Sequence, residues 1–270
     1  MKTTAARLLK LTAAAGDALR TPRPGAVVLL YHRVNGGSGM AVDLPTALFA
    51  AQMEALAGTP GTASLDSLLL ATATPDAPPV QPVAVTFDDG TADFADHAVP
   101  VLVRTGVPAT LYVATDFVES GRPFPHDGVP LSWAGLRDVV STGMVTIGSH
   151  THTHALLDRL PTEQVADELD RSVKLIEDRL GLTPEHFAYP KALLGSPAAQ
   201  DAVRRRFRSA ALAGTRSNPY GTTDAYRLGR SPIQVADGMT WFHRKARGGM
   251  ALEDDIRRLV NRRRYAGAVT

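Results

Sequence analysis

The sequence contains no cysteine, which excludes disulfides, cysteine metal ligands and a cysteine nucleophile. It has no run near the roughly 18 apolar residues that a membrane-spanning helix needs. Neither sign of charge dominates, because 29 Lys and Arg stand against 27 Asp and Glu, a net charge of +2. This balance is too small to indicate nucleic acid as a partner. Because cysteine is absent, any metal site must use His, Asp and Glu.

The 270 residues, 44% of them hydrophobic, are enough for one domain with a sizeable core, and they contain no internal repeat. Residues 1–25 resemble a signal peptide at first, but Lys10 interrupts the apolar run, so we expect an N-terminal amphipathic extension. We expect the main domain at residues 26–240 and a basic, helical C-terminal extension at 241–270. The arginines of that extension predict a solvated helix face or, as the alternative, peripheral contact with an anionic membrane surface or glycan. The expected location is cytoplasmic or membrane-peripheral.

Short apolar runs alternate with helical patterns along the main domain. The clearest helix is predicted at residues 161–180, where apolar residues recur at helical spacing and Gly181 follows. Repeated strand-helix units predict an α/β fold with a parallel sheet. About seven strands in one domain favour an incomplete barrel, with an open doubly wound sheet as the alternative. Residues 115–131 are rich in Gly and Pro and predict a loop over the site. The expected strands are residues 26–31, 83–87, 109–114, 144–147, 186–189, 209–213 and 228–235.

Polar residues follow several of these strands directly, and the carboxyl ends of strands are where α/β folds bind ligands. Asp88 and Asp89 come directly after residues 83–87. Two adjacent carboxylates cannot comfortably both stay ionised without a partner, and a bound cation resolves their repulsion. A polar Asp-Asp-Gly turn is the alternative interpretation.

His150 and His154 follow the strand predicted at residues 144–147, four residues apart. In a helical turn, side chains at this spacing lie on one face about 5–6 Å apart, close enough to bind one metal ion. Two imidazoles and one carboxylate from the Asp88-Asp89 pair would form an open metal site. The second carboxylate would remain free to act as a base.

These segments resemble motifs of the polysaccharide deacetylases, the NodB-type domains of carbohydrate esterase family four. The resemblance runs from about residue 26 to about residue 235, in the order of the family. The opening Leu30-Tyr31-His32-Arg33-Val34 resembles the subgroup that acts on exopolysaccharides such as poly-N-acetylglucosamine. The three motifs are Thr86-Phe87-Asp88-Asp89-Gly90, Ser149-His150-Thr151-His152-Thr153-His154 and Phe187-Ala188-Tyr189-Pro190.

The resemblance implies a distorted, incomplete (β/α)7-8 barrel and a divalent metal, most often zinc, bound by Asp89, His150 and His154. It implies that Asp88 is the base that activates the attacking water. It also implies that a backbone N–H following Tyr189-Pro190 helps to bind the oxyanion of the tetrahedral intermediate. The expected substrate is an N-acetylated glycan and the expected products are a free amine and acetate.

The sequence departs from the family pattern at two places. Lys191-Ala192 follows Pro190 where the family has an aromatic residue and then Gly, and the upstream Arg of this motif is missing. Lys191 would contact the oxyanion or an acidic glycan, or lie in solvent as an ordinary loop lysine. The late Leu-x-His motif, which supplies the general acid, has no clear match. His32, at the end of a strand, is favoured as general acid over His243.

Arg227 and Arg230 flank Leu228-Gly229 before the last predicted strand. One of them is expected to orient Asp88 through a charge-assisted ion pair, whereas Arg227 is favoured as a surface residue. Two alternatives to a polysaccharide deacetylase remain open. The altered motifs also fit a glycan-binding pseudoenzyme, and the same scaffold could carry a metal-dependent amidohydrolase for a small amide.

Overall fold

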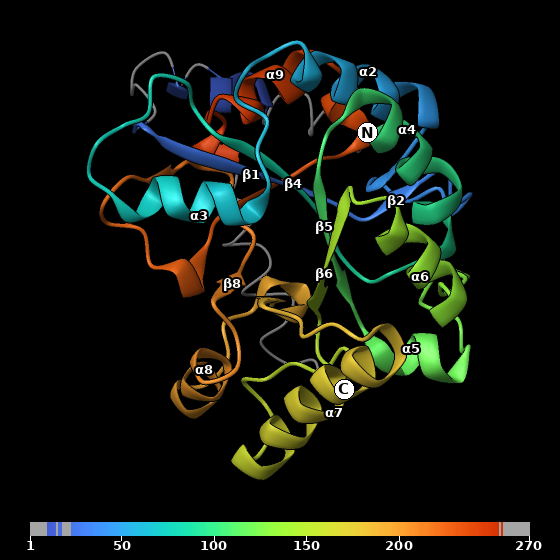
Figure 1. The fold of residues 1–270 in the computed structure, drawn as a ribbon. Coiled ribbons are helices and arrows are strands. Elements are labelled where there is room, and N and C mark those ends of the chain that lie inside the picture. The colour runs from blue at the N-terminus through green and yellow to red at the C-terminus, as the bar shows by residue number, and fades with distance from the viewer. Residues whose placement is uncertain (1–9, 15, 18–22, 254, 256–270) are drawn as a thin grey trace.

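The predicted apolar runs form the strands of one curled sheet in a computed structural model, which describes residues 10–14, 16–17, 23–253 and 255 (Figure 1). The sheet has eight strands in the order β10-β1-β4-β5-β6-β7-β8, with β9 paired to β1 outside this path. Their bounds are β1 Gly25–Tyr31, β4 Val83–Phe87, β5 Ala109–Val113, β6 Val145–Ser149, β7 His186–Ala188, β8 Ser209–Ala211, β9 Asn218–Pro219 and β10 Arg230–Pro232.

Neighbouring strands along the path are parallel, and only β9 runs antiparallel to β1. The last strand, β8, returns to the segment that leads into β10. A parallel bridge joins Ala211 to Leu228, and Gly214 N–H donates to the Arg230 carbonyl at 2.7 Å. The sheet therefore curls into an irregular barrel, and the prediction of a distorted, incomplete (β/α) barrel is confirmed.

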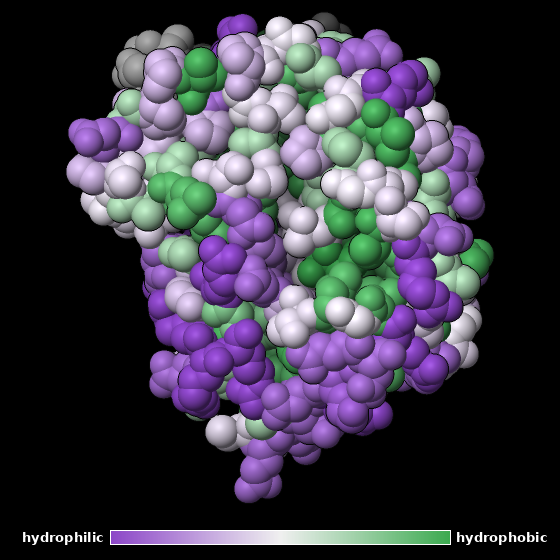
Figure 2. Space-filling model, in the orientation of Figure 1, coloured by the Kyte–Doolittle hydropathy of each residue, from purple (hydrophilic) through white to green (hydrophobic). Residues whose placement is uncertain are grey.

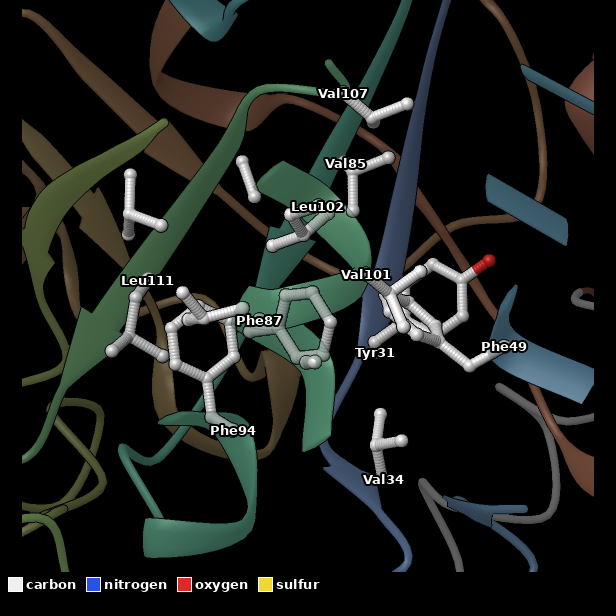
Figure 3. Close-up of a cluster of buried hydrophobic side chains, with 14 of the residues drawn as sticks. Tyr31, Val34, Phe49, Val85, Phe87, Phe94, Val101, Leu102, Val107 and Leu111 are labelled. Atoms are coloured by element: carbon white, nitrogen blue, oxygen red, sulfur yellow. The ribbon is translucent and has the colours of Figure 1, made fainter. Parts of the chain in front are cut away.

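Alternate residues of each strand face opposite sides of the sheet, as the two-residue period of a strand requires. The outward residues pack under the surrounding helices. Figure 3 shows the rings of Tyr31, Phe49 and Phe87 in this outer core, with the Tyr31 centroid 5.3 Å from each of the other two. The inward residues line the barrel, and apart from Tyr112 they are mostly small, which leaves room there for large polar side chains. They include Ala26, Val28, Ala84, Tyr112, Ala188 and Ala211.

Gly148 in β6 makes space for the ring of Tyr112. A Cβ atom placed on Gly148 would lie 2.6 Å from a Tyr112 ring carbon and 2.8 Å from the His186 carbonyl oxygen. Both distances are below ordinary van der Waals contact, and the backbone oxygen of His186 cannot rotate away. A glycine is therefore needed at this strand position.

Replacing Gly148 by alanine is expected to lower the free energy of unfolding by about 1–3 kcal/mol, the usual cost of overpacking an interior. The reason is the contact of the added methyl group with Tyr112 and the backbone of β7. Urea unfolding of the wild type and the variant measures the difference. Equal midpoints and slopes would mean that the barrel interior adapts to the extra methyl group without cost.

The helices lie outside the sheet (Figure 1). Three features differ from the prediction. Residues 115–131 are not all loop, because α5 occupies the first six of them. The helix α3 follows a serine cap that was not predicted from the sequence. The helix α4 is preceded directly by a π-helical turn, Phe94–Ala98. The helix bounds are α2 Thr46–Ala57, α3 Leu65–Ala73, α4 Val99–Thr105, α5 Thr115–Ser120, α6 Trp133–Ser141, α7 Thr162–Leu180, α8 Pro197–Arg204 and α9 Thr240–Ala246. The remaining short elements are β2 Arg33–Val34, β3 Asp43–Leu44 and the 3-10 turns Pro190–Ala192, Ala225–Arg227 and Val235–Asp237.

The two predicted extensions meet in the described part of the chain. Lys10 is buried, pairs with Asp237 and lies 3.1 Å from a Glu253 carboxylate oxygen, while Lys245 lies 2.9 Å from Asp237. The arginines at residues 257–264 lie outside the described residues, as does most of the second half of the helical extension expected at 241–270. Within the described ranges, every helix is too short or too polar to cross a membrane.

Candidate active site and metal centre

The carboxyl ends of β4 and β6 bring Asp89, His150 and His154 together, as the chain order of the motifs predicted. One ligand atom from each residue lies within 4.8 Å of the others. The distance from Asp89 Oδ1 is 3.7 Å to His150 Nε2 and 3.6 Å to His154 Nε2. These separations are too long for hydrogen bonds. They are close to the roughly 3.4 Å that separates two ligands held about 2.1 Å from one tetrahedral metal ion.

The backbone reaches this arrangement through left-handed residues and not through the helical turn that the His spacing suggested. Asp89 has φ 77°, Thr151 has φ 64° and His154 has φ 66°. Residues 151–154 form a loop, so the i,i+4 spacing of the two histidines does not place them on a helix. Left-handed backbone is unfavourable for residues other than Gly and typically occurs at functional sites.

The protonation of the two histidines suits metal binding. His150 Nδ1 lies 2.8 Å from the Ala188 carbonyl oxygen, so Nδ1 carries the proton and donates to that oxygen. The unprotonated Nε2 faces Asp89. Burial lowers the pKa of His150. Burial and the neighbouring charge of His150 lower the pKa of His154 to about 3. Both imidazoles are therefore neutral near pH 7, which is the form that binds a metal, and the donor set fits a divalent cation.

Asp88 lies beside this cluster, with Oδ2 3.8 Å from His150 Nε2, and its carboxylate is bound from inside the barrel by Arg230. The two guanidinium nitrogens of Arg230 donate to the two Asp88 oxygens at 2.5 and 2.8 Å. Burial alone would raise the pKa of Asp88, but the charge and hydrogen bonds of Arg230 outweigh it and hold the pKa below its usual range. Asp88 is consequently an ionised, oriented carboxylate next to the candidate metal ligands.

Arg230 is fully buried, so it faces the interior and not the substrate side. Its Nε donates to the Leu212 carbonyl at 3.0 Å, and its guanidinium lies 5.2 Å from the centre of the Tyr112 ring. Side chains alternate between the two faces of a strand, so Asp88, directly after β4, continues the inward-facing series of that strand. Arg230 of β10 also points into the barrel, and the two side chains therefore meet. Arg227, by contrast, is exposed and pairs with Asp224 at 3.8 Å.

The two histidines considered as general acid lie in different surroundings. His32 follows β1 and is partly buried, and its charge contributes to lowering the pKa of Asp88, which places it near that carboxylate. Its Nδ1 is buried and has no hydrogen-bond partner among the described residues. His243 lies at an exposed position on α9. Of the two, His32 is the one close to Asp88.

The third motif forms the turn Pro190–Ala192 after β7. Tyr189 is buried and packs edge-on against Phe187, with ring centroids 5.0 Å apart. Lys191 and Ala192 both have left-handed backbone, with φ 53° and 56°. Lys191 is exposed, and its positive charge contributes to lowering the pKa of His154.

Sequence reasoning did not single out Glu168, Thr115 or Asp116, although all three contact the segment between His150 and His154. Glu168 lies on the buried face of α7 with Val165 and Leu169. A carboxylate inside an otherwise apolar helix stripe is unusual, because buried charges need partners. That break in the pattern was the available signal.

A cavity of about 510 Å³ lies beside His154, lined among others by Thr153, Arg159, Gln164 and Glu168. A larger one, about 930 Å³, borders Arg23, Asn218 and Gly229 at the amino ends of the strands. We assign function to the first, because chemistry in α/β barrels takes place at the carboxyl ends. The surface over α7 and α8 is mainly hydrophilic (Figure 2).

Comparisons with known proteins agree with this geometry. The polysaccharide deacetylase family model matches residues 76–209. YxkH of Bacillus subtilis (strain 168), whose name assigns it provisionally to this family, is 29% identical over 180 residues, or 64% of this chain. The match spans 59% of the length of YxkH.

Two solved structures extend the likeness over most of the chain. IcaB from Ammonifex degensii has a TM-score of 0.71 at 25% identity, covering 83% of this chain and 97% of its own. The Streptococcus pyogenes deacetylase PplD, solved in complex with acetate, has a TM-score of 0.69 at 20% identity, covering 82% and 99%, and shows the shared fold. The resemblance seen in the motifs is thus confirmed: residues 76–209 of this chain match the polysaccharide deacetylase family, whose members are metal-dependent hydrolases of carbon–nitrogen bonds.

Proposed function

We propose that this chain removes N-acetyl groups from a hexosamine-containing polysaccharide or its precursor and releases acetate. The observation that carries the proposal is the juxtaposition of two units. One is the Asp89-His150-His154 cluster, and the other is the Asp88 carboxylate that Arg230 keeps ionised beside it. Metal-assisted amide hydrolysis requires these two elements, a Lewis acid and a nearby proton acceptor.

Zinc is the metal we propose, because two imidazoles and one carboxylate with further positions open form a common catalytic zinc site. A cation bound there would polarise the acetyl carbonyl and increase the acidity of the attacking water. The other steps belong to residues of this chain. Asp88 takes a proton from the water while the oxygen of that water forms a bond to the carbonyl carbon. The backbone N–H of Lys191 helps to bind the oxyanion.

Breakdown of the tetrahedral intermediate requires a proton for the departing amine. We assign this proton to His32, which lies near Asp88. As the carbon–nitrogen bond breaks, His32 protonates the sugar nitrogen and acetate is released. In the cavity beside His154, the side chains of Arg159 and Gln164 would donate hydrogen bonds to the hydroxyl groups of a neighbouring sugar unit.

The decisive experiment is acetate release from N-acetylglucosamine oligomers by metal-stripped protein, with and without added Zn²⁺ or Co²⁺. We expect release only after metal is restored, and none from His150→Ala, which should lose both metal and activity. Bound metal without acetate release would indicate a glycan-binding protein. Release from small amides alone would indicate a different amidohydrolase.

A further inference from the structure

The loop between the two metal-binding histidines adopts a backbone that its own residues do not favour. Thr151 and His154 have φ values of 64° and 66°, in the left-handed region, and Thr151 is β-branched. Such a conformation persists only where surrounding contacts enforce it. Because the loop sets the separation of the two imidazoles, whatever enforces it also sets the geometry of the metal centre.

Glu168 of α7 holds this loop through three hydrogen bonds. Its Oε2 accepts from the backbone N–H groups of His152 and Thr153 at 3.0 and 2.8 Å, and its Oε1 accepts from Thr153 Oγ1 at 2.7 Å. All three donors lie between His150 and His154. The carboxylate is 9% exposed and lies on the buried face of a 19-residue helix, so it is a rigid and charged acceptor.

The first turn of α5 holds the same loop from the other side. The amide of Asp116 donates to the His152 carbonyl at 2.9 Å, and the amide of Thr115 donates to the Thr151 carbonyl at 3.4 Å. The His152 ring is also fixed, with Nδ1 2.9 Å from Thr115 Oγ1. The loop amides thus bind α7 while its carbonyls bind α5, and Glu168 supplies the charged part of this clamp.

We infer that Glu168 is a positioning residue for the metal centre: it holds His150 and His154 at the separation that one metal ion requires. The inference rests on the proposed function only in taking these histidines as ligands. Outer-shell groups that orient ligands commonly affect metal affinity about 10- to 100-fold. A residue that merely supported the fold would change stability and leave the properties of the bound metal unchanged.

The test is Glu168→Gln, which keeps the size of the side chain but leaves one oxygen for three donors and turns an N–H₂ group toward them. Zinc affinity is measured by competition with a chelator, and ligand geometry by the visible absorption of the Co²⁺-loaded protein. We expect affinity to fall about 10- to 100-fold and the Co²⁺ spectrum to change. Circular dichroism establishes that the variant is folded.

Asp167→Asn is the matched control, because it removes the same charge from the adjacent residue. The Asp167 carboxylate is exposed and lies 3.5 Å from Arg171 on its own helix. Its zinc affinity should stay within about twofold of the wild type, since exposed ion pairs contribute little. Glu168→Gln with the affinity and spectrum of Asp167→Asn would overturn the inference.

Thr153→Val decides the question if Glu168→Gln does not fold, because it removes only the Oγ1 donor. We expect a weakening of zinc binding smaller than that of Glu168→Gln, and an unchanged affinity would overturn the inference. Metal binding is measured without substrate, so the two proposals fail separately. A wild type that binds zinc but releases no acetate would contradict the proposed function alone. An active wild type with an unaffected Glu168→Gln would contradict the positioning role alone.

Discussion

Replacing Arg230 by methionine is expected to lower the free energy of unfolding by about 3–5 kcal/mol, the cost of leaving one partner of a buried ion pair uncompensated. Arg230 is fully buried and donates twice to Asp88, which is itself buried. Methionine fills much of the same volume, so the loss would come from the unpaired carboxylate more than from a cavity. Chemical denaturation of the metal-free protein at pH 7 measures it.

A double variant tests whether the pair or the packing is responsible. Asp88→Leu combined with Arg230→Met removes both charges, and we expect it to regain most of the lost stability, because apolar residues often replace a buried ion pair without cost. Arg230→Lys keeps the charge but not the two-point contact and should be intermediate. If the double variant were as unstable as Arg230→Met, the shape of the arginine and not its charge would matter.

The loss of stability in Arg230→Met should depend on pH, and it should be larger at neutral pH than in acid. In the wild type the pKa of Asp88 is below its usual value, so the stability from this carboxylate is present above pH 4 and lost only in stronger acid. Without Arg230, burial dominates and raises the pKa, so the folded variant would hold a proton that the unfolded chain releases. The difference between the two proteins should therefore be largest near pH 7 and shrink below pH 4. A constant difference would mean that Asp88 is not the group affected.

Replacing Asp88 by asparagine is expected to lower kcat by about 10²–10⁴-fold, the usual contribution of a positioned general base. Asparagine preserves the shape of the side chain and can still accept one hydrogen bond from Arg230, but it cannot take a proton from water. The metal ligands Asp89, His150 and His154 are unchanged, so metal content should match the wild type. Acetate release and metal analysis on the same preparation measure both.

Asp89→Asn is the informative comparison, because it replaces one oxygen of the neighbouring carboxylate by an amide nitrogen, the same change as in Asp88→Asn. Asp89 Oδ1 faces both imidazoles, so this variant should lose metal affinity together with activity. The expected contrast is an inactive, metal-loaded Asp88→Asn and a metal-poor Asp89→Asn. Full activity in Asp88→Asn, or its loss of metal, would contradict the roles assigned to the two residues.

Much of the fold could be predicted because strand residues buried on both faces form continuous apolar runs that stand out in a sequence. The seven main strands lie where those runs are, although β10 is shorter than the predicted residues 228–235. The helices α3 and α5 were missed because they are nine and six residues long, too short for a clear periodic pattern. Their positions depend on packing against the sheet.

The grouping of the candidate site residues could also be predicted, because these residue types stand together at strand ends. Asp88 with Asp89, and His150 with His154, are local pairs, and the carboxyl ends of parallel strands meet at one edge. The loop that carries the histidines could not be predicted. Its left-handed residues are ones that sequence propensity disfavours, and contacts from α5 and α7 impose them.

By itself, the sequence determined the strand pattern, the family motifs and the types of ligand available, since these depend on local order along the chain. Only the tertiary structure decided which partners complete the site. Arg230 lies 142 residues from Asp88, and Glu168 lies 16 residues from His152. Such contacts depend on strand parity and the curl of the sheet, because the curled sheet turns both Asp88 and Arg230 into one buried interior.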